Sequence, residues 1–120
     1  MITGFEDITF ELTNKELAYV DVFVKSFKKK IGKSMIISNQ EIIRTLESKG
    51  FFEHSKYGRL DAVRVRKIIR YIRYNKLIKN LIATSKGYYI ENNPDRLAEY
   101  KESLIQRARS IYKLALTYDV

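Results

Sequence analysis

The sequence predicts a mainly α-helical fold with one small β-hairpin, an α+β protein that forms a single domain over residues 1–120. In several segments apolar residues recur every three or four positions, and residues that cap helices precede them. One later segment instead alternates around Gly87, as the two strands of a hairpin do. With 120 residues, of which 45% are hydrophobic, the chain is long enough to bury a core without disulfides.

The first helix is expected over residues 14–31, after a weakly alternating stretch at residues 8–12 that favours a short edge strand. Thr13 suits the N-cap position because its hydroxyl can accept a hydrogen bond from an amide of the first turn. Gly32 suits the end of this helix, and the three lysines at 28–30 favour the negative end of its dipole. The apolar positions that share one face are Leu17, Val20, Val24, Phe27 and Ile31.

The next segment predicts a short strand followed by a short helix. Residues 35–37 are apolar and favour a strand that makes a single bridge. Ser38 and Glu41 have the spacing of a capping box, which predicts a helix from residue 39 to about residue 48. Residues 50–59 carry glycines near both ends and indicate a loop. The positions expected to be buried in this helix are Ile42, Ile43 and Leu46.

The third helix is expected over residues 62–76, with Asp61 as its N-cap. Its apolar arc of about 120° on a helical wheel consists of Ala62, Val65, Ile68, Ile69 and Ile72. The opposite arc consists of Val63, Lys67, Arg70 and Tyr74. The residues that flank this opposite arc are Arg64 and Tyr71 on one side and Arg66 and Arg73 on the other. The predicted helix is therefore apolar on one side and basic on the other.

Residues 81–90 predict a hairpin of two short strands with Gly87 in its turn. Alternate strand residues face opposite sides of a sheet. Of the adjacent Tyr88 and Tyr89, one is therefore expected to enter the core and the other to lie near the turn, in a packing role rather than in recognition.

Asn93 and Pro94 are expected to begin a long final helix over residues 94–117. Its apolar positions follow a three-and-four spacing and are Leu97, Tyr100, Leu104, Ala108, Ile111, Ala115 and Tyr118. Four of these are seven residues apart, which favours pairing with a parallel or an antiparallel helix. A homodimer through this C-terminal helix is therefore expected.

The net charge of +9 is concentrated in one part of the chain. Between Lys56 and Tyr88 there are ten basic residues and one acid, Asp61, so this segment accounts for the whole net charge. Residues 62–75 contain no acid, so no ion pair along the helix relieves the repulsion among its cations. One alternative is that this side of the helix is only a solvated face. The uncompensated and localised charge favours a polyanionic partner instead.

The order of the expected elements is strand, helix, short strand, helix, helix, hairpin, helix, which is the order of a winged helix-turn-helix. Residues 36–90, with the motifs ISNQEI, VRKIIRYIR and SKGYYI, resemble the small winged-helix proteins of bacteriophages and related mobile elements. The resemblance implies that residues 62–75 form a DNA recognition helix and residues 84–88 the tip of the wing. In that family a tight turn joins the second and third helices, whereas about ten residues intervene here. Either the second helix is longer than expected, or the loop is an insertion near the partner.

The side chains of the third helix favour the same function. An α-helix fits the major groove of DNA, and residues near its N-terminus reach base edges. Arg64 and Lys67 are therefore expected to contact guanine, and Arg66 and Arg70 to contact phosphates.

Other polar residues extend this expected surface. Tyr71 and Tyr74 can donate hydrogen bonds to phosphates, and Ser85 and Lys86 can reach a neighbouring phosphate or the minor groove. The complete set of expected DNA-binding residues is Arg59, Arg64, Arg66, Lys67, Arg70, Tyr71, Arg73, Tyr74, Lys79, Ser85 and Lys86.

The function expected from this surface is binding of double-stranded DNA, in a phage transcriptional regulator or an accessory replication protein. An alternative from another class is a protein-interaction module that inhibits a host factor through the same basic face. RNA binding is a third alternative, but exposed aromatic residues on a sheet, which single-strand readers use for stacking, are not evident in the sequence.

The sequence gives no indication of an enzyme, a metal site or another cofactor site. The chain has no cysteine and one histidine, His54, which is expected to be incidental in its loop. Residues 32–34 lack the upstream glycine of a phosphate-binding loop. No apolar run has the length of a membrane span, and the N-terminus lacks the pattern of a signal peptide. A cytoplasmic location, in a bacterium or an infected host cell, is expected.

Overall fold

The computed structural model describes residues 11–120. Within them the chain forms four helices and a two-stranded antiparallel sheet, a mainly helical α+β fold. The strand expected at residues 8–12 lies mostly outside the described residues. None of the described helices has the length and apolar character needed to cross a membrane. The elements in chain order are α1 (Asn14–Phe27), η2 (Lys33–Met35), α2 (Asn39–Ser48), η3 (Phe51–Glu53), α3 (Ala62–Tyr74), β1 (Leu81–Thr84), β2 (Gly87–Ile90) and α4 (Pro94–Ala115).

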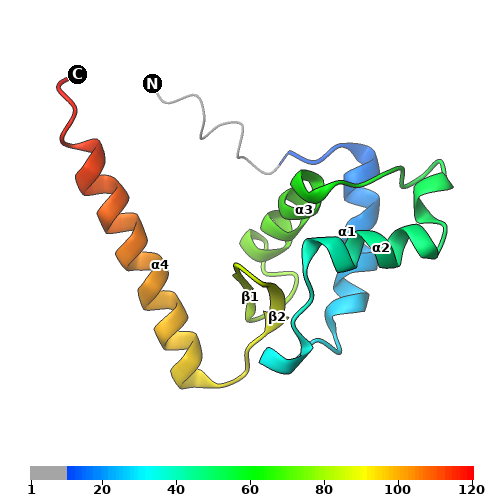
Figure 1. Ribbon diagram of the computed structural model, residues 1–120, viewed down its shortest axis with the longest axis horizontal. Helices are drawn as coiled ribbons and strands as arrows, with labels where there is room; N and C mark the ends of the chain where they lie inside the picture. The colour runs from blue at the N-terminus through cyan, green and yellow to red at the C-terminus, as the bar shows by residue number, and fades with distance from the viewer. Residues whose placement is uncertain (1–10) are drawn as a thin grey trace.

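Helices α1, α2 and α3 pack together with the hairpin into a body, and α4 leaves this body from the end of β2 (Figure 1). The side chains at the centre of the body come mostly from α1 and α3, and α2 and the hairpin close it from the sides. The fully buried side chains among the described residues are Tyr19, Val65, Ile68, Ile69 and Ile72.

Helix α1 begins as expected but buries a different face and ends earlier. Thr13 caps it, and Glu16 completes a capping box by accepting a hydrogen bond from the Thr13 amide. The predicted face was right at Val20 and Phe27, which are buried. It was wrong at Leu17 and Ile31, which are exposed, and at Val24, which is only half-buried. The side chains that α1 buries are Glu16, Tyr19, Val20, Phe23 and Phe27. Apolar residues surround this helix on most sides, so its periodicity alone does not select the buried face.

The prediction that α1 continues to residue 31 was also wrong. The helix ends at Phe27, and the chain then runs beside β2. The Ile90 amide donates to the Lys30 carbonyl at 2.7 Å, and the Gly32 amide donates to the Ile90 carbonyl at 2.8 Å. The lysines at 28–30 therefore follow the helix instead of forming its last turn.

Helix α2 confirms its predicted bounds and its capping box between Ser38 and Glu41. Ile42 and Leu46 are buried, and Ile43 is half-buried. The segment at 50–59 contains the short η3 turn, and its aromatic rings pack against α1. The Tyr19 hydroxyl donates a hydrogen bond to the Gly58 carbonyl, which ties this segment to α1. Because α2 ends at Ser48, the alternative of a longer second helix does not apply.

Helix α3 confirms the expected cap and the expected two-sided character. The Asp61 carboxylate accepts a hydrogen bond from the Arg64 amide at 2.9 Å. The helix ends at Tyr74, two residues before the expected position, and Ala62 at its start is only half-buried. The buried apolar stripe consists of Val65, Ile68, Ile69 and Ile72.

The hairpin confirms the expected strands, with Thr84 paired to Gly87 across the turn. The expected strand at 35–37 is reduced to Ile37, which pairs with Tyr88 through two backbone hydrogen bonds of 2.8 and 3.0 Å. A Cβ atom at Gly87 would lie 2.2 Å from the Ile37 carbonyl oxygen. Only glycine therefore allows the segment before α2 to lie against the hairpin.

Helix α4 begins at Pro94, with the Asn93 side chain accepting hydrogen bonds from the amides of Asp95 and Arg96. It ends at Ala115, two residues before the expected end. No residue of α4 is buried. Its main polar link to the body is the Tyr100 hydroxyl, which donates to the Ala83 carbonyl at 3.1 Å and accepts from the Ala83 amide at 3.2 Å.

Candidate nucleic-acid interface

The basic side of α3 is turned away from the core. Arg64 and Arg66 are exposed near the start of the helix, and Val63 beside them is 62% exposed. The opposite side of the helix holds the fully buried stripe, so the orientation of these arginines is set by core packing. The first two turns of α3 therefore present charge to solvent.

Three elements meet beside Arg66 in a polar crevice of about 300 Å³. The start of α2 contributes one wall, the start of α3 contributes the second, and the turn of the hairpin contributes the third. The Tyr88 hydroxyl donates a hydrogen bond of 2.6 Å to Asn39 Oδ1, which links the hairpin to α2. The residues that line this crevice are Ser38, Asn39, Gln40, Ala62, Arg66, Thr84, Ser85, Lys86, Gly87 and Tyr88.

The pKa of Tyr88 depends on its burial and on the charges around it. Burial raises the pKa of its hydroxyl, although the hydrogen bond to Asn39 and the positive charges of three arginines act in the opposite direction. The three arginines that act on Tyr88 are Arg66, Arg70 and Arg73. Arg66 of α3 and Lys86 of the hairpin line the same crevice, so the two elements share one basic surface.

The turn of the hairpin holds Ser85 and Lys86 in exposed positions. Thr84 Oγ1 accepts a hydrogen bond from the Lys86 amide at 3.1 Å and donates one to the Gly87 carbonyl at 3.2 Å. These bonds define the local backbone, so Lys86 projects from an ordered turn.

A second depression, of about 1010 Å³, continues the basic surface toward α4. Arg73 Nη2 donates a hydrogen bond of 2.7 Å to the Tyr100 hydroxyl, so this arginine also fixes the base of α4. Arg70 and Arg73 are half-buried, whereas Tyr74 and Lys79 are exposed. The residues that line the depression are Arg70, Arg73, Tyr74, Lys76, Ile78, Lys79, Asn80, Leu81 and Leu104.

Lys67 does not have the position expected for a base contact. Its Nζ atom lies 3.2 Å from Glu16 Oε1 on α1, and the Glu16 side chain is only 3% exposed. Burial alone would raise the pKa of Glu16, but the hydrogen bonds from Thr13 and Lys67 outweigh it and hold the pKa below its usual value. Lys67 therefore connects α3 to α1.

Three tyrosines of this region pack against other side chains of the protein: Tyr71, Tyr88 and Tyr89. Tyr71 is half-buried against the core. Tyr88 belongs to the core, as expected for one member of the pair, but Tyr89 is equally buried and does not lie exposed near the turn. It lies beside Tyr100 and Glu91 at the base of α4, because α4 begins directly behind this face of the hairpin.

Arg59 lies at the end of the segment before α3 and is exposed. Its guanidinium carbon is 5.7 Å from the centre of the Phe52 ring, within the range of a cation–π contact. Arg64 Nη1 lies 3.5 Å from the Arg59 carbonyl, so the two arginines are neighbours at the N-terminal end of the basic surface.

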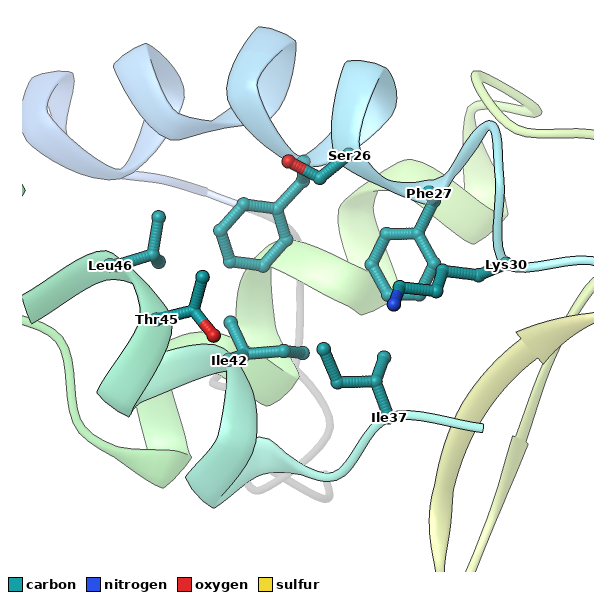
Figure 2. A pocket seen from close by; sticks show the side chains of 8 residues that line it. Ser26, Phe27, Lys30, Ile37, Ile42, Thr45 and Leu46 are labelled. Carbon is teal, nitrogen blue, oxygen red and sulfur yellow. The ribbon is translucent and has the colours of Figure 1, made fainter. Parts of the chain in front are cut away.

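The described residues form no metal site, and the apolar pocket between α1 and α2 is smaller than the usual site for a small molecule. No group of acidic or histidine residues among those described is arranged to hold a metal ion, and His54 Nδ1 accepts a hydrogen bond from the Lys56 amide within its own turn. Figure 2 shows an apolar pocket between α1 and α2, lined by Phe27, Ile37, Leu46 and their neighbours. Its volume of about 50 Å³ is far below the several hundred Å³ of typical small-molecule sites.

Sequence reasoning missed the contribution of α2 to this interface. The residues Asn39 and Gln40 reach it because Ile37 pairs with the hairpin, and this contact joins segments that are far apart in the sequence. The glycine at position 87 was the one available signal, since it allows that contact.

Comparison with known proteins finds no match to this chain, whether to a protein-family model, a curated protein or a solved structure. The function therefore has to be inferred from the geometry and the charge of the chain itself.

Proposed function

We propose that this protein is a winged helix-turn-helix protein that binds double-stranded DNA through α3 and the turn of the hairpin. The observation that carries the proposal is the meeting of the start of α2, the basic side of α3 and the hairpin turn on one surface. The order of α1, the Ile37 bridge, α2, α3 and the hairpin supports the winged-helix assignment.

In this proposal α3 enters the major groove, where its N-terminal residues reach base edges. Arg64 is the residue best placed to read a base, because it is exposed in the first turn. Arg66 contacts a phosphate held at the polar crevice, with Lys86 and Ser85 on the neighbouring phosphate or in the minor groove. Lys67 takes no part in base reading, since it is paired with Glu16.

The C-terminal part of α3 supplies affinity without sequence choice. Arg70, Tyr74 and Lys79 line the second depression and contact the phosphate backbone in this proposal. Arg73 contributes charge there while it holds Tyr100. Tyr71 supports the helix from the core side.

The biological role that we propose is that of a phage or mobile-element transcriptional regulator, or of an accessory replication protein, acting in the cytoplasm. The proposal includes no catalytic step and no cofactor. It accounts for the concentration of positive charge on α3, because phosphates relieve the repulsion among these cations in the complex.

The test is fluorescence anisotropy of a labelled duplex of about 30 base pairs, titrated with the full chain at several salt concentrations. With four to six phosphate contacts, log K against log salt concentration should have a slope of about −4 to −5. Arg66→Glu should abolish most of the binding. Lys49→Glu, which reverses an exposed cation at the opposite end of α2, should leave it nearly unchanged.

Absence of binding even at low salt would overturn the proposal. A stable protein partner recovered from a nuclease-treated host lysate, without retained nucleic acid, would then assign the basic surface to inhibition of a host factor. Equal losses for Arg66→Glu and Lys49→Glu would show binding through net charge alone.

A further inference from the structure

Helix α4 is the one α-helix among the described residues that buries no side chain. It has 22 residues, and none of them is buried. From its start beside the hairpin, α4 runs away from the body (Figure 1), and Ile111 near its end is 63% exposed. Helices in proteins gain most of their stability from packing an apolar face against another surface. We therefore expect the apolar side of α4 to be covered by a partner.

The apolar residues of α4 form one arc, which Lys101 interrupts in the first half of the helix. At 100° per residue, Leu104, Ala108, Ile111 and Ala115 lie within about 60° of one another, and Ile105 and Tyr112 extend the arc on one side. The two alanines at its centre permit close approach of a second helix. The exposed larger side chains of this arc are Leu104, Ile111 and Tyr112.

The charges of α4 are divided between its two halves. The first half carries three acids and two cations, a net charge of −1, and the second half carries three cations and no acid, a net charge of +3. A parallel pair of such helices would gather six cations at one end. An antiparallel pair places the net negative half of each helix opposite the net positive half of the other, and it also opposes the two helix dipoles.

We propose that two copies of this chain pair through α4 in antiparallel orientation. Glu102 and Arg109 lie one heptad apart on the same flank of the helix, about 40–60° beyond Ile105 on the helical wheel. In an antiparallel pair, the same flank of each helix lies against that flank of the other helix. Glu102 of each copy therefore lies near Arg109 of the other. The two-fold axis then passes midway between these residues, at Ile105 and Gln106.

This arrangement places the two bodies at opposite ends of the paired helices. A helix of 22 residues is roughly 33 Å long, which is close to the 34–36 Å between major-groove half-sites one turn apart. If the proposed DNA binding holds, the dimer should therefore prefer an inverted repeat. The pairing itself does not depend on DNA and can be tested without it.

The experiment is sedimentation equilibrium of the full chain without DNA. The wild-type protein should sediment at twice its 14.2 kDa mass at about 100 μM. Glu102→Arg or Arg109→Glu alone should weaken the dimer roughly tenfold, because each turns two attractions into two repulsions. The double variant should recover the wild-type association.

Glu99→Arg is the matched control, since it makes the same charge change on the polar side of α4 and should leave the dimer intact. A monomeric wild-type protein would overturn the proposal. Rescue of Glu102→Arg by Arg107→Glu in place of Arg109→Glu would also overturn it, because that pair forms only between parallel helices. Duplex anisotropy on the same samples reports DNA binding separately from self-association.

Discussion

Helices α3 and α4 have the same kind of apolar periodicity but opposite positions in the molecule. The apolar stripe of α3 is completely buried between α1, α2 and the hairpin. The apolar arc of α4 has no residue buried, and the helix is held to the body mainly at Tyr100. Periodicity therefore predicts a helix with one apolar side. Which surface covers that side depends on where the helix lies in the tertiary structure.

The charges of the two helices differ in a related way. Helix α3 has cations and no acid, so its charges cannot neutralise one another and are suited to a polyanion. Helix α4 has both signs in its first half and only cations in its second half, which suits a second copy of itself in the reverse direction. In the two proposals above, the two helices therefore bind two different partners.

The strongest test of this contrast compares the same substitution in the two helices. Ile68→Ala removes a side chain with no exposed surface from α3 and should lower the free energy of unfolding by about 2–5 kcal/mol. Ile111→Ala in α4 should lower that of the body by less than about 0.5 kcal/mol, because its side chain is exposed. Urea unfolding followed by near-ultraviolet circular dichroism of the tyrosines measures both.

The two variants should be compared at a concentration where both have the same oligomeric state, since Ile111→Ala is also expected to weaken the dimer. If both substitutions destabilise the body equally, α4 packs on the body in solution and its apolar arc is not available to a second copy.

A smaller effect is expected at the glycine that joins the hairpin to α2. Gly87→Ala places a Cβ atom 2.2 Å from the Ile37 carbonyl oxygen, at a φ of +139°. The bridge between Ile37 and Tyr88 must then open, at a cost of about 2–4 kcal/mol. The affinity for duplex DNA should fall as well, because the polar crevice depends on this contact.

Gly50→Ala is the control for that substitution. Gly50 also has a positive φ, of +82°, but no atom lies within 4 Å of a Cβ placed there. Only backbone strain of about 1 kcal/mol should result. Equal losses at the two glycines would mean that the close approach of Ile37 contributes nothing to stability.

The parts of the fold that could be predicted from the sequence depend on residues close together in the chain. The caps at Thr13, Ser38, Asp61 and Asn93 place the starts of four helices, because each side chain bonds to an amide two or three residues away. The hairpin is similarly local, since its strands are joined by a turn of two residues.

The parts that could not be predicted depend on distant residues. Lys67 and Glu16 are 51 positions apart, and a basic residue in a basic helix carries no local sign that it is reserved for an ion pair. The buried face of α1 was misassigned because the aromatic residues at 51 and 57, which pack on Tyr19, come from the segment read as a loop. The predicted DNA-binding surface likewise lacked the start of α2, which lines the same crevice as Arg66 and Lys86.

The smallest predicted change in stability concerns the ion pair between α1 and α3. Glu16→Gln removes the ion pair with Lys67 and should lower the free energy of unfolding by about 1 kcal/mol at neutral pH. The pKa of Glu16 is held below its ordinary value of 4.5, so its contribution is complete above that pH and is lost as the pH falls through the lower, folded-state pKa. Urea unfolding of the variant and the wild type at pH 3 to 7 measures this difference.

Glu41→Gln is the matched control, since Glu41 occupies the same position in the capping box of α2. Its pKa is lowered mainly by the hydrogen bond from the Ser38 backbone, and it makes no ion pair among the described residues. Glutamine can keep that hydrogen bond, so the loss should be smaller than at Glu16. If Glu16→Gln and Glu41→Gln lower the free energy of unfolding equally, the ion pair with Lys67 does not stabilise the packing of α1 on α3. Lys67 would then be free to contact DNA, and Lys67→Met should weaken binding as much as Arg64→Ala does.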